Sequence, residues 1–251
     1  MLTILNQHPR DLDIVFNEKE HSYRLKSAPD IAFTSVTTFI KRFFNEFDAD
    51  SVLAKMARFG ALAKKYPNMT MDEVKAAWKE KGRAAAETGT RLHKYIELFF
   101  NGVEGEDVKG IDSEVEMFKN WICDLEPKFI PFRTEWVIWD SELKIAGCID
   151  MLFRSERDPR SVYIFDWKKS AAIKHKGYDR PKEPISHLQD CNYTHYCLQL
   201  NLYKFLLERN YGLSVEGMFL VVIHGDNAEV QMVPVPPMPD EIQAILAAAR
   251  N

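Results

Sequence analysis

The pattern of hydrophobic and polar positions predicts a short hairpin followed by a mostly helical stretch. Two β-rich runs, 13–16 and 22–25, flank a polar segment and predict an N-terminal hairpin. Apolar positions at helical spacing, with capping residues such as Thr34, Ser35 and Thr70 before them, predict helices further along the chain. The expected helices span residues 36–44, 52–66, 74–79, 83–100 and 113–125.

After Pro131 the pattern changes to β-branched and aromatic runs separated by polar turns, which is typical of strands. A polar, irregular segment over 171–190 follows, and then a helix over 193–209. Asp240 is expected to cap a last short helix. The expected strands span residues 133–139, 144–153, 162–167, 218–223 and 229–233.

This order of elements predicts an α/β core preceded by a mostly helical region. We place the boundary between residues 82 and 83, with the hairpin and helical region at 1–82 and the core at 83–251. The chain has 251 residues, of which 46% are hydrophobic and 28% charged, as in soluble globular proteins. No apolar run approaches the roughly 20 residues of a membrane helix, and the N-terminus becomes polar too early for a secretory signal. We therefore expect a soluble, intracellular protein without a membrane partner.

Charge and cysteine content narrow the function only slightly. The net charge of −4 argues against a protein that coats polyanions, but affinity for phosphates depends on where the cations lie. Residues 41–94 hold twelve Lys and Arg against seven Asp and Glu, and residues 160–182 hold seven against two, so each stretch is locally +5. These stretches either line a groove or are ordinary solvated faces. The four cysteines include no C-x-x-C pair, and we expect no disulfides.

Three ionisable residues on the predicted strands are the first candidates for chemistry. Asp166 and Lys168 are two apart on one strand and share a face, while Trp167 points to the other. Asp150 interrupts an apolar run on the preceding strand, where an unpaired buried charge would cost several kcal/mol. A divalent cation between Asp150 and Asp166 would compensate it, and hard oxygen ligands favour Mg²⁺ or Mn²⁺. Lys168 could then orient a water or stabilise charge on a phosphate.

Other polar residues have a structural reading beside a functional one. Gln199 and Tyr203 are four apart on a predicted helix and could reach the same site or form a polar stripe beside the core. His93 could bind a metal or be structural, and Glu135 could join the metal ligands or form a surface ion pair. Asp166 and Lys168 alone could be an ordinary ion pair at a strand end.

Five short motifs occur together in a fixed order along the chain. They are G-T-x-x-H at 89–93, Glu135, G-x-x-D at 147–150, D-x-K at 166–168 and Q-x-x-x-Y at 199–203. Together they resemble the PD-(D/E)XK nucleases of the RecB-like exonuclease branch, in particular the mitochondrial genome maintenance exonuclease and related viral and phage nucleases. Those proteins also carry a segment like FTSVTTFI at 33–40, and the resemblance covers about 33–233.

The resemblance implies a restriction-endonuclease-like core, with a central mixed sheet flanked by helices, and a metal-dependent DNA nuclease. It implies that Asp150 and Asp166 bind the metal, that the Trp167 carbonyl adds a ligand and that Lys168 acts on the water or phosphate. His93 would bind or support a metal, Glu135 would lie near the site, and Gln199 and Tyr203 would contact DNA or orient Lys168.

It also implies exonuclease action on single-stranded or frayed DNA ends, in DNA processing, recombination or repair. The N-terminal region would wrap the DNA. The family often shows D-x-K-T-S, where this chain has Lys169 in place of Thr. Some relatives hold an iron–sulfur cluster through cysteines after the Q-x-x-x-Y helix; because no cysteine follows Tyr203, we expect no cluster. Candidate DNA contacts are Lys41, Arg42, Arg91, Lys94, Lys169 and Ser170.

Three other hypotheses remain open at this point. His187, Cys191, His195 and the nearby Cys197 could form a zinc site. The protein could be a non-catalytic DNA-binding or scaffold protein with a relic nuclease fold, although the intact Asp150, Asp166 and Lys168 argue against it. It could also be a structure-specific endonuclease.

Overall fold

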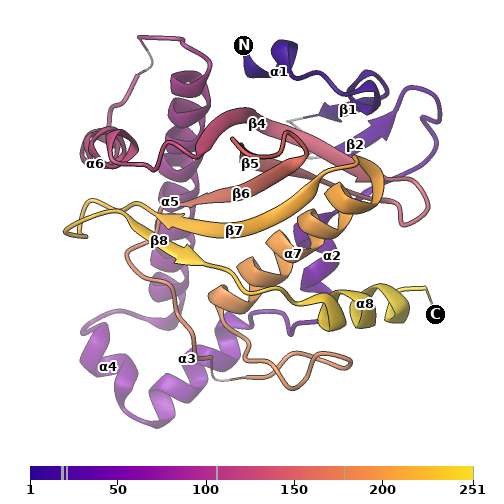
Figure 1. Ribbon diagram of the computed structural model, residues 1–251. Coiled ribbons are helices and arrows are strands. Elements are labelled where there is room, and N and C mark those ends of the chain that lie inside the picture. Colours follow the sequence, from indigo (N-terminus) through magenta and orange to yellow (C-terminus); the bar gives the residue numbers. More distant parts are fainter. Residues whose placement is uncertain (18–19, 21, 106, 178, 251) are drawn as a thin grey trace.

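A six-stranded mixed sheet forms the centre of the molecule (Figure 1), in a computed structural model that describes residues 1–17, 20, 22–105, 107–177 and 179–250. Neighbouring strands pair along the path β3-β5-β6-β7-β8. Strand β4 is off this path and pairs with β5. The β3–β5 and β6–β7 pairs are parallel and the others antiparallel. The strands are β3 (Thr34–Ser35), β4 (Phe129–Asp140), β5 (Ile145–Ser155), β6 (Ser161–Lys168), β7 (Ser214–Val222) and β8 (Gln231–Pro234).

Helices pack against both faces of this sheet, which confirms the predicted α/β class with a mixed sheet flanked by helices. One core joins the sheet to α2, α7 and α8, and a second joins it to α5 and α6 (Figure 1). No helix of the described residues is both long and apolar enough to cross a membrane. The helices are α1 (Leu2–Leu5), α2 (Val36–Lys41), α3 (Ala49–Arg58), α4 (Ala61–Lys65), α5 (Met71–Phe100), α6 (Asp112–Cys123), α7 (Asn192–Asn210) and α8 (Pro239–Ala248), with a 3₁₀ turn at Pro9–Leu12.

The predicted N-terminal hairpin is confirmed as the antiparallel pair β1 (Ile14–Asn17) and β2 (Ser22–Leu25). Residues 18, 19 and 21 of the connecting segment lie outside the described residues. Tyr23 and Leu25 of β2 are buried in a third cluster with Trp139 of β4. The hairpin is thus fixed to the end of the main sheet.

Helix α5 is one 30-residue helix where the sequence predicted two, over 74–79 and 83–100. It begins at a capping box in which Thr70 and Glu73 bond to each other's backbone amides. Gly82 costs a helix only about 1 kcal/mol, and Arg83 spans the position with ion pairs to Glu80 and Glu87. The boundary predicted between residues 82 and 83 falls inside this helix, so we describe the chain without a division there.

Several predicted elements differ in their ends: the strands predicted to begin at residues 133 and 218 begin at 129 and 214, and the helix predicted to end at 44 ends at 41. Two further differences have a clear physical cause. The helix expected over 52–66 is divided into α3 and α4, because Gly60 adopts a left-handed backbone with φ of 69°. The last helix is capped at Met238 and begins with Pro239, which suits the first helical position, so Asp240 lies in the first turn and is not the cap.

Candidate functional site

Three potential metal ligands from three elements meet on the sheet. His93 of α5, Glu135 of β4 and Asp150 of β5 each offer a ligand atom, and these atoms lie within 4.8 Å of one another. Within the described part of the chain, this is the only such group of three or more His, Cys, Asp or Glu. The paired positions on either side, Thr134 with Met151 and Trp136 with Ile149, place Glu135 opposite Asp150 across the strand pair. Sheet register therefore brings the two carboxylates together.

The backbone of Trp167 orients two members of this group. His93 Nε2 lies 2.9 Å from the Trp167 carbonyl oxygen, and because a carbonyl only accepts, Nε2 is the donor. The other ring nitrogen, Nδ1, lies 3.6 Å from Asp150 Oδ2. The Trp167 amide in turn donates to Asp150 Oδ2 at 2.9 Å. A metal-binding histidine commonly has its second nitrogen fixed in this way, so the Trp167 carbonyl supports a candidate ligand. That this carbonyl itself binds a metal stays a prediction.

Glu135 is the strained and desolvated member of the group. Its φ of 42° lies in the left-handed region, which is unusual for a glutamate and concentrates at functional sites. Burial raises the pKa of Glu135 to about 8, and the nearby charge of Asp150 contributes in the same direction. The Cys148 thiol donates to Glu135 Oε2 at 3.2 Å.

A divalent cation fits this donor set. It would compensate the two neighbouring carboxylates, whose oxygens suit Mg²⁺ or Mn²⁺, while the imidazole adds one nitrogen ligand. His93, Glu135 and Asp150 are the residues that would hold the ion.

Asp166 lies outside this group of three, and its carboxylate instead contacts Lys168. The side chain of Asp166 is only 2% exposed, and Oδ2 forms an ion pair with Lys168 Nζ without a well-directed hydrogen bond. The other oxygen, Oδ1, accepts from Gln199 Nε2 at 3.3 Å. Lys168 Nζ also lies 4.5 Å from the ring centre of Tyr196, a cation–π contact. The predicted Asp–Lys pair is therefore present and buried.

Burial acts differently on the two partners of this pair. It raises the pKa of Asp166, and the positive charge of Lys168 only partly opposes this. For Lys168 burial would lower the pKa, but the charges of Asp166 and Asp150 outweigh it and raise the pKa. Lys168 is accordingly a cation at neutral pH, suited to stabilise negative charge and not to accept a proton.

Gln199 and Tyr203 of α7 reach the same place, as their spacing predicts. Gln199 Nε2 lies 3.2 Å from the Tyr203 hydroxyl and bridges it to Asp166. The Tyr203 ring lies against Gly147 of β5, where an added Cβ would be 2.6 Å from Tyr203 Cε1 and 3.0 Å from Val36 Cγ2. The glycine of the G-x-x-D motif therefore makes room for the tyrosine of the Q-x-x-x-Y motif.

The cations predicted to contact DNA have varied surroundings. Lys41 and Arg42 are exposed at the end of α2, and Arg42 donates to Thr34 Oγ1 at 3.0 Å. Arg91 donates to the carbonyl of Lys109, and Lys94 pairs with Glu97 at 2.8 Å.

Lys169 and Ser170, also predicted to contact DNA, are engaged within the protein. Lys169 pairs with Glu114 at 2.9 Å, with both side chains largely buried. Ser170 Oγ donates to the carbonyl of Ala172 at 3.0 Å. Lys169 is therefore placed to hold the protein together instead of facing a ligand.

Sequence reasoning missed three residues of this neighbourhood. Tyr196 lies one helical turn before Gln199 on the face that meets the sheet, and this spacing could have signalled it. Cys148 lies two residues before Asp150 on the same strand and so shares its face. The sequence could therefore have predicted that Cys148 lies near Glu135. Nothing in the local pattern identifies Glu114, because its partner lies 55 positions away.

The residues of the alternative zinc site each have a different partner. His187 faces Glu241 at 3.2 Å and His195 faces Asp190 at 3.0 Å. Cys191 Sγ lies 3.3 Å from Thr194 Oγ1, and Cys197 is buried in the core around α7. The four side chains do not gather as a metal site.

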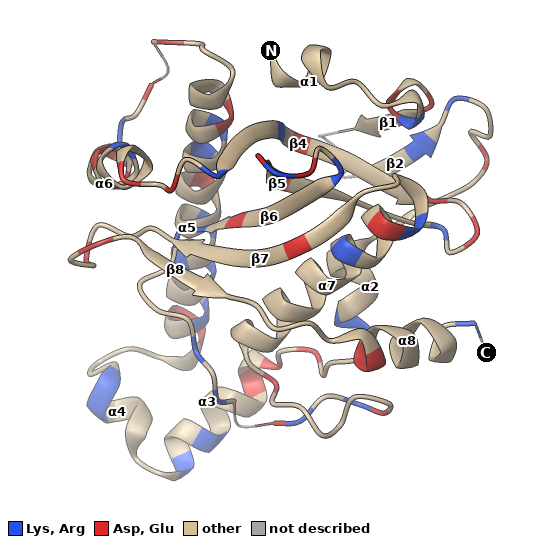
Figure 2. Ribbon diagram, viewed as in Figure 1, with Lys and Arg blue, Asp and Glu red and all other residues tan. Residues whose placement is uncertain are grey.

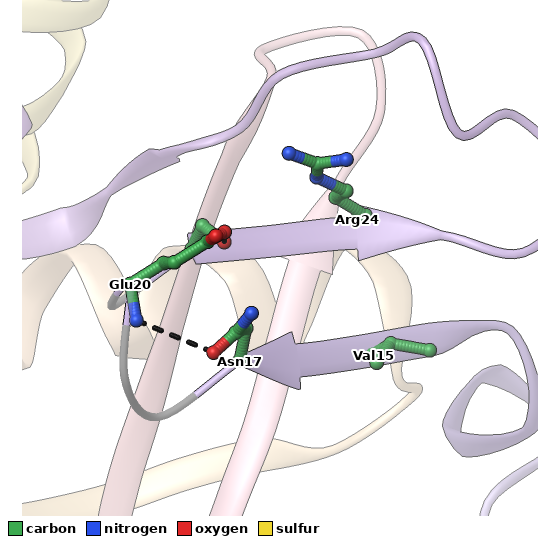
Figure 3. A pocket seen from close by; sticks show the side chains of 5 residues that line it. Val15, Asn17, Glu20 and Arg24 are labelled. Atoms are coloured by element: carbon green, nitrogen blue, oxygen red, sulfur yellow. Dashed lines mark hydrogen bonds between the residues drawn. The ribbon is translucent and has the colours of Figure 1, made fainter.

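A hollow lies elsewhere, on the N-terminal hairpin. It measures about 250 Å³ and is lined by Val15, Asn17, Glu20, Ser22 and Arg24 (Figure 3). These residues are exposed or half-buried, and the hollow holds none of the predicted site residues.

Comparison with known proteins identifies no family for this chain. No family model matches the chain, and no curated protein matches it. A solved structure of a protein designated SSO0001 aligns with 87% of this chain and 73% of its own chain, at 14% sequence identity and a TM-score of 0.31. At that TM-score the likeness carries no argument about fold or function.

Proposed function

We propose that this protein is a metal-dependent nuclease with a PD-(D/E)XK core, and that it hydrolyses phosphodiester bonds in DNA. The observation that carries the proposal is the position of Trp167. Its amide and carbonyl contact Asp150 and His93, and its sequence neighbours Asp166 and Lys168 form the buried ion pair. A candidate cation site and a buried lysine are thus joined by a single residue.

The side chains divide the chemical work between them. His93, Glu135 and Asp150 would hold Mg²⁺ or Mn²⁺, which when bound lowers the pKa of water and neutralises phosphate charge. Lys168 remains protonated and stabilises negative charge that develops on the phosphate. Asp166 and Tyr196 hold the ammonium in place, while Gln199 and Tyr203 fix Asp166 from the side of α7.

Cations and aromatic rings for DNA binding are available on α3 and α4. Helix α3 carries Lys and Arg and helix α4 carries Lys (Figure 2), and α3 lies beside the first half of α5, where Lys75 pairs with Asp50. The Phe59 side chain between them is 79% exposed, and such rings can stack on the bases of single strands. This arrangement supports action on single-stranded or frayed ends, in DNA processing, recombination or repair, and we propose exonuclease cleavage.

Digestion of end-labelled linear and circular DNA, single and double stranded, tests the proposal. We expect cleavage with Mg²⁺ or Mn²⁺ and none with EDTA. Asp150→Asn and Lys168→Met should each lower the rate by about 10²-fold or more. The exposed-site variants Asp30→Asn and Lys119→Met serve as matched controls and should cut normally.

Three other outcomes would contradict parts of the proposal. Normal cutting by folded Asp150→Asn and Lys168→Met protein would overturn the mechanism. Cleavage of circular DNA would refute exonuclease action and favour an endonuclease. Metal-independent DNA binding without any cleavage would favour a scaffold protein.

A further inference from the structure

Glu114 and Lys169 form a second buried ion pair beside the Asp166–Lys168 pair. Glu114 lies in the first turn of α6, and its side chain is 6% exposed, against 14% for Lys169. Their charged atoms are 2.9 Å apart. Burying a charged pair is costly unless its geometry is good and its remaining polar atoms are satisfied. The further hydrogen bonds of the Glu114 carboxylate are what make this buried pair favourable.

The Glu114 carboxylate joins three segments that are far apart in the sequence. Oε1 accepts from Lys169 Nζ and from the Gly225 amide, at 2.9 and 3.1 Å, and Oε2 accepts from Ser113 Oγ at 3.0 Å. Burial would raise the pKa of Glu114, but these hydrogen bonds outweigh it and lower the pKa. A Cβ at Gly225 would lie 2.5 Å from Ser113 Oγ, so any other residue here would displace the serine hydroxyl that donates to Glu114. The carboxylate thus ties α6 to the end of β6 and to the loop after β7.

This contact acts on the backbone next to Lys168. The Lys168 carbonyl accepts from the Ile223 amide at 2.9 Å and from the Ser170 amide at 3.0 Å, so the ends of β6 and β7 are fixed to each other. Lys168 directs its side chain to Asp166 and Tyr196, while Lys169 directs its own to α6. The two lysines therefore hold the end of β6 from opposite faces of the sheet.

The geometry points to Glu114 and Lys169 as positioning residues for the Lys168 ammonium. Neither lies among the residues proposed to touch the metal or the phosphate. They act by fixing the strand end from which Lys168 reaches the site, and a small displacement of such a group can cost orders of magnitude in rate. The inference rests on the proposed nuclease function for its kinetic consequence, but the placement of Lys168 can be measured without that activity.

The test uses Glu114→Gln, Lys169→Met and the conservative Lys169→Arg in the full chain. Glu116→Gln and Lys119→Met, at exposed positions on the same helix, are the matched controls. We expect Glu114→Gln and Lys169→Met to lower kcat about tenfold or more, with KM and the affinity for Mn²⁺ changed less than about threefold. Lys169→Arg should recover most of kcat, because it retains the charge and the donors.

A second measurement follows Lys168 itself. The rate of reductive methylation of Lys168, read by peptide mass spectrometry at a temperature where every variant is folded, should rise about threefold or more in Glu114→Gln and Lys169→Met. The controls should match the wild type. If these variants lower the melting temperature but leave both kcat and Lys168 methylation unchanged, the pair is only structural and the inference is overturned.

The same measurement separates the inference from the proposed function. If the wild-type protein cuts no DNA, the nuclease proposal fails, yet faster methylation of Lys168 in the two variants would still support the positioning role. Unchanged methylation would overturn that role whether or not the wild type is a nuclease.

Discussion

Replacing Glu135 with glutamine should change how stability depends on pH. In the folded protein without metal, burial and the charge of Asp150 raise the pKa of Glu135 from its ordinary 4.5 to about 8. Between these values the folded protein keeps a proton that the unfolded chain releases. The stability that Glu135 contributes is therefore fully present below pH 4.5 and is lost as the pH rises to about 8.

The magnitude follows from the size of this change in pKa. Each pH unit within the window costs about 1.4 kcal/mol, so the whole window corresponds to roughly 5 kcal/mol at the upper limit. Glu135→Gln removes the titration but preserves the size of the side chain. The difference in slope between the two proteins then reports the titration of Glu135 within its cluster, because the titrating groups away from the cluster are common to both.

Urea unfolding in EDTA at several pH values from 5 to 8 measures this difference. The wild type should lose several kcal/mol more than Glu135→Gln over this range, and the exposed-site control Glu156→Gln should follow the wild type. Mn²⁺ must displace the same proton, so its affinity for the wild type should rise with pH up to about 8. Equal slopes in wild type and Glu135→Gln would refute the reasoning.

Three further substitutions test the packing around the site by urea unfolding. Gly147→Ala places a Cβ 2.6 Å from the Tyr203 ring and should lower the free energy of unfolding by about 1–3 kcal/mol. The control Gly89→Ala enters open space in α5 and should not destabilise the protein. Equal effects of the two substitutions would contradict the close contact at Gly147. Thr70→Ala removes the cap of α5 and should cost about 1 kcal/mol; no loss would mean the cap is unimportant. Phe118→Ala empties a fully buried site and should cost about 3–5 kcal/mol; a loss below 1 kcal/mol would contradict this packing.

The strands of the sheet could be predicted because their pattern is local. The runs at 144–153 and 162–167 became β5 and β6 with ends shifted by two residues at most. Their alternation also placed Asp166 and Lys168 on one face, where they meet. The prediction failed at Gly82, which α5 passes through without a break, because one glycine costs a helix only about 1 kcal/mol and the local ion pairs of Arg83 span it.

The partners within the site were less accessible to sequence reasoning. That Asp150 and Asp166 share a cation stays a prediction. The register of β4 and β5 brings Glu135 to Asp150, a partner that local pattern did not identify, and Asp166 contacts Lys168. The positive φ of Glu135 has no local signal, since nothing in its neighbourhood is a turn sequence. Lys169 was expected to face DNA because its charge was visible and its partner, Glu114, was not.

The buried side chain of Trp167 fixes the backbone that orients His93 and Asp150. It is 1% exposed and packs among Phe100, Phe118 and Trp121 in the core beneath α5 and α6. Its backbone amide and carbonyl, meanwhile, contact Asp150 and His93. Because a close-packed aromatic core tolerates little displacement, the burial of this ring fixes the two hydrogen bonds that orient His93 and Asp150. A large apolar residue between Asp166 and Lys168 therefore links core packing directly to the geometry of the site.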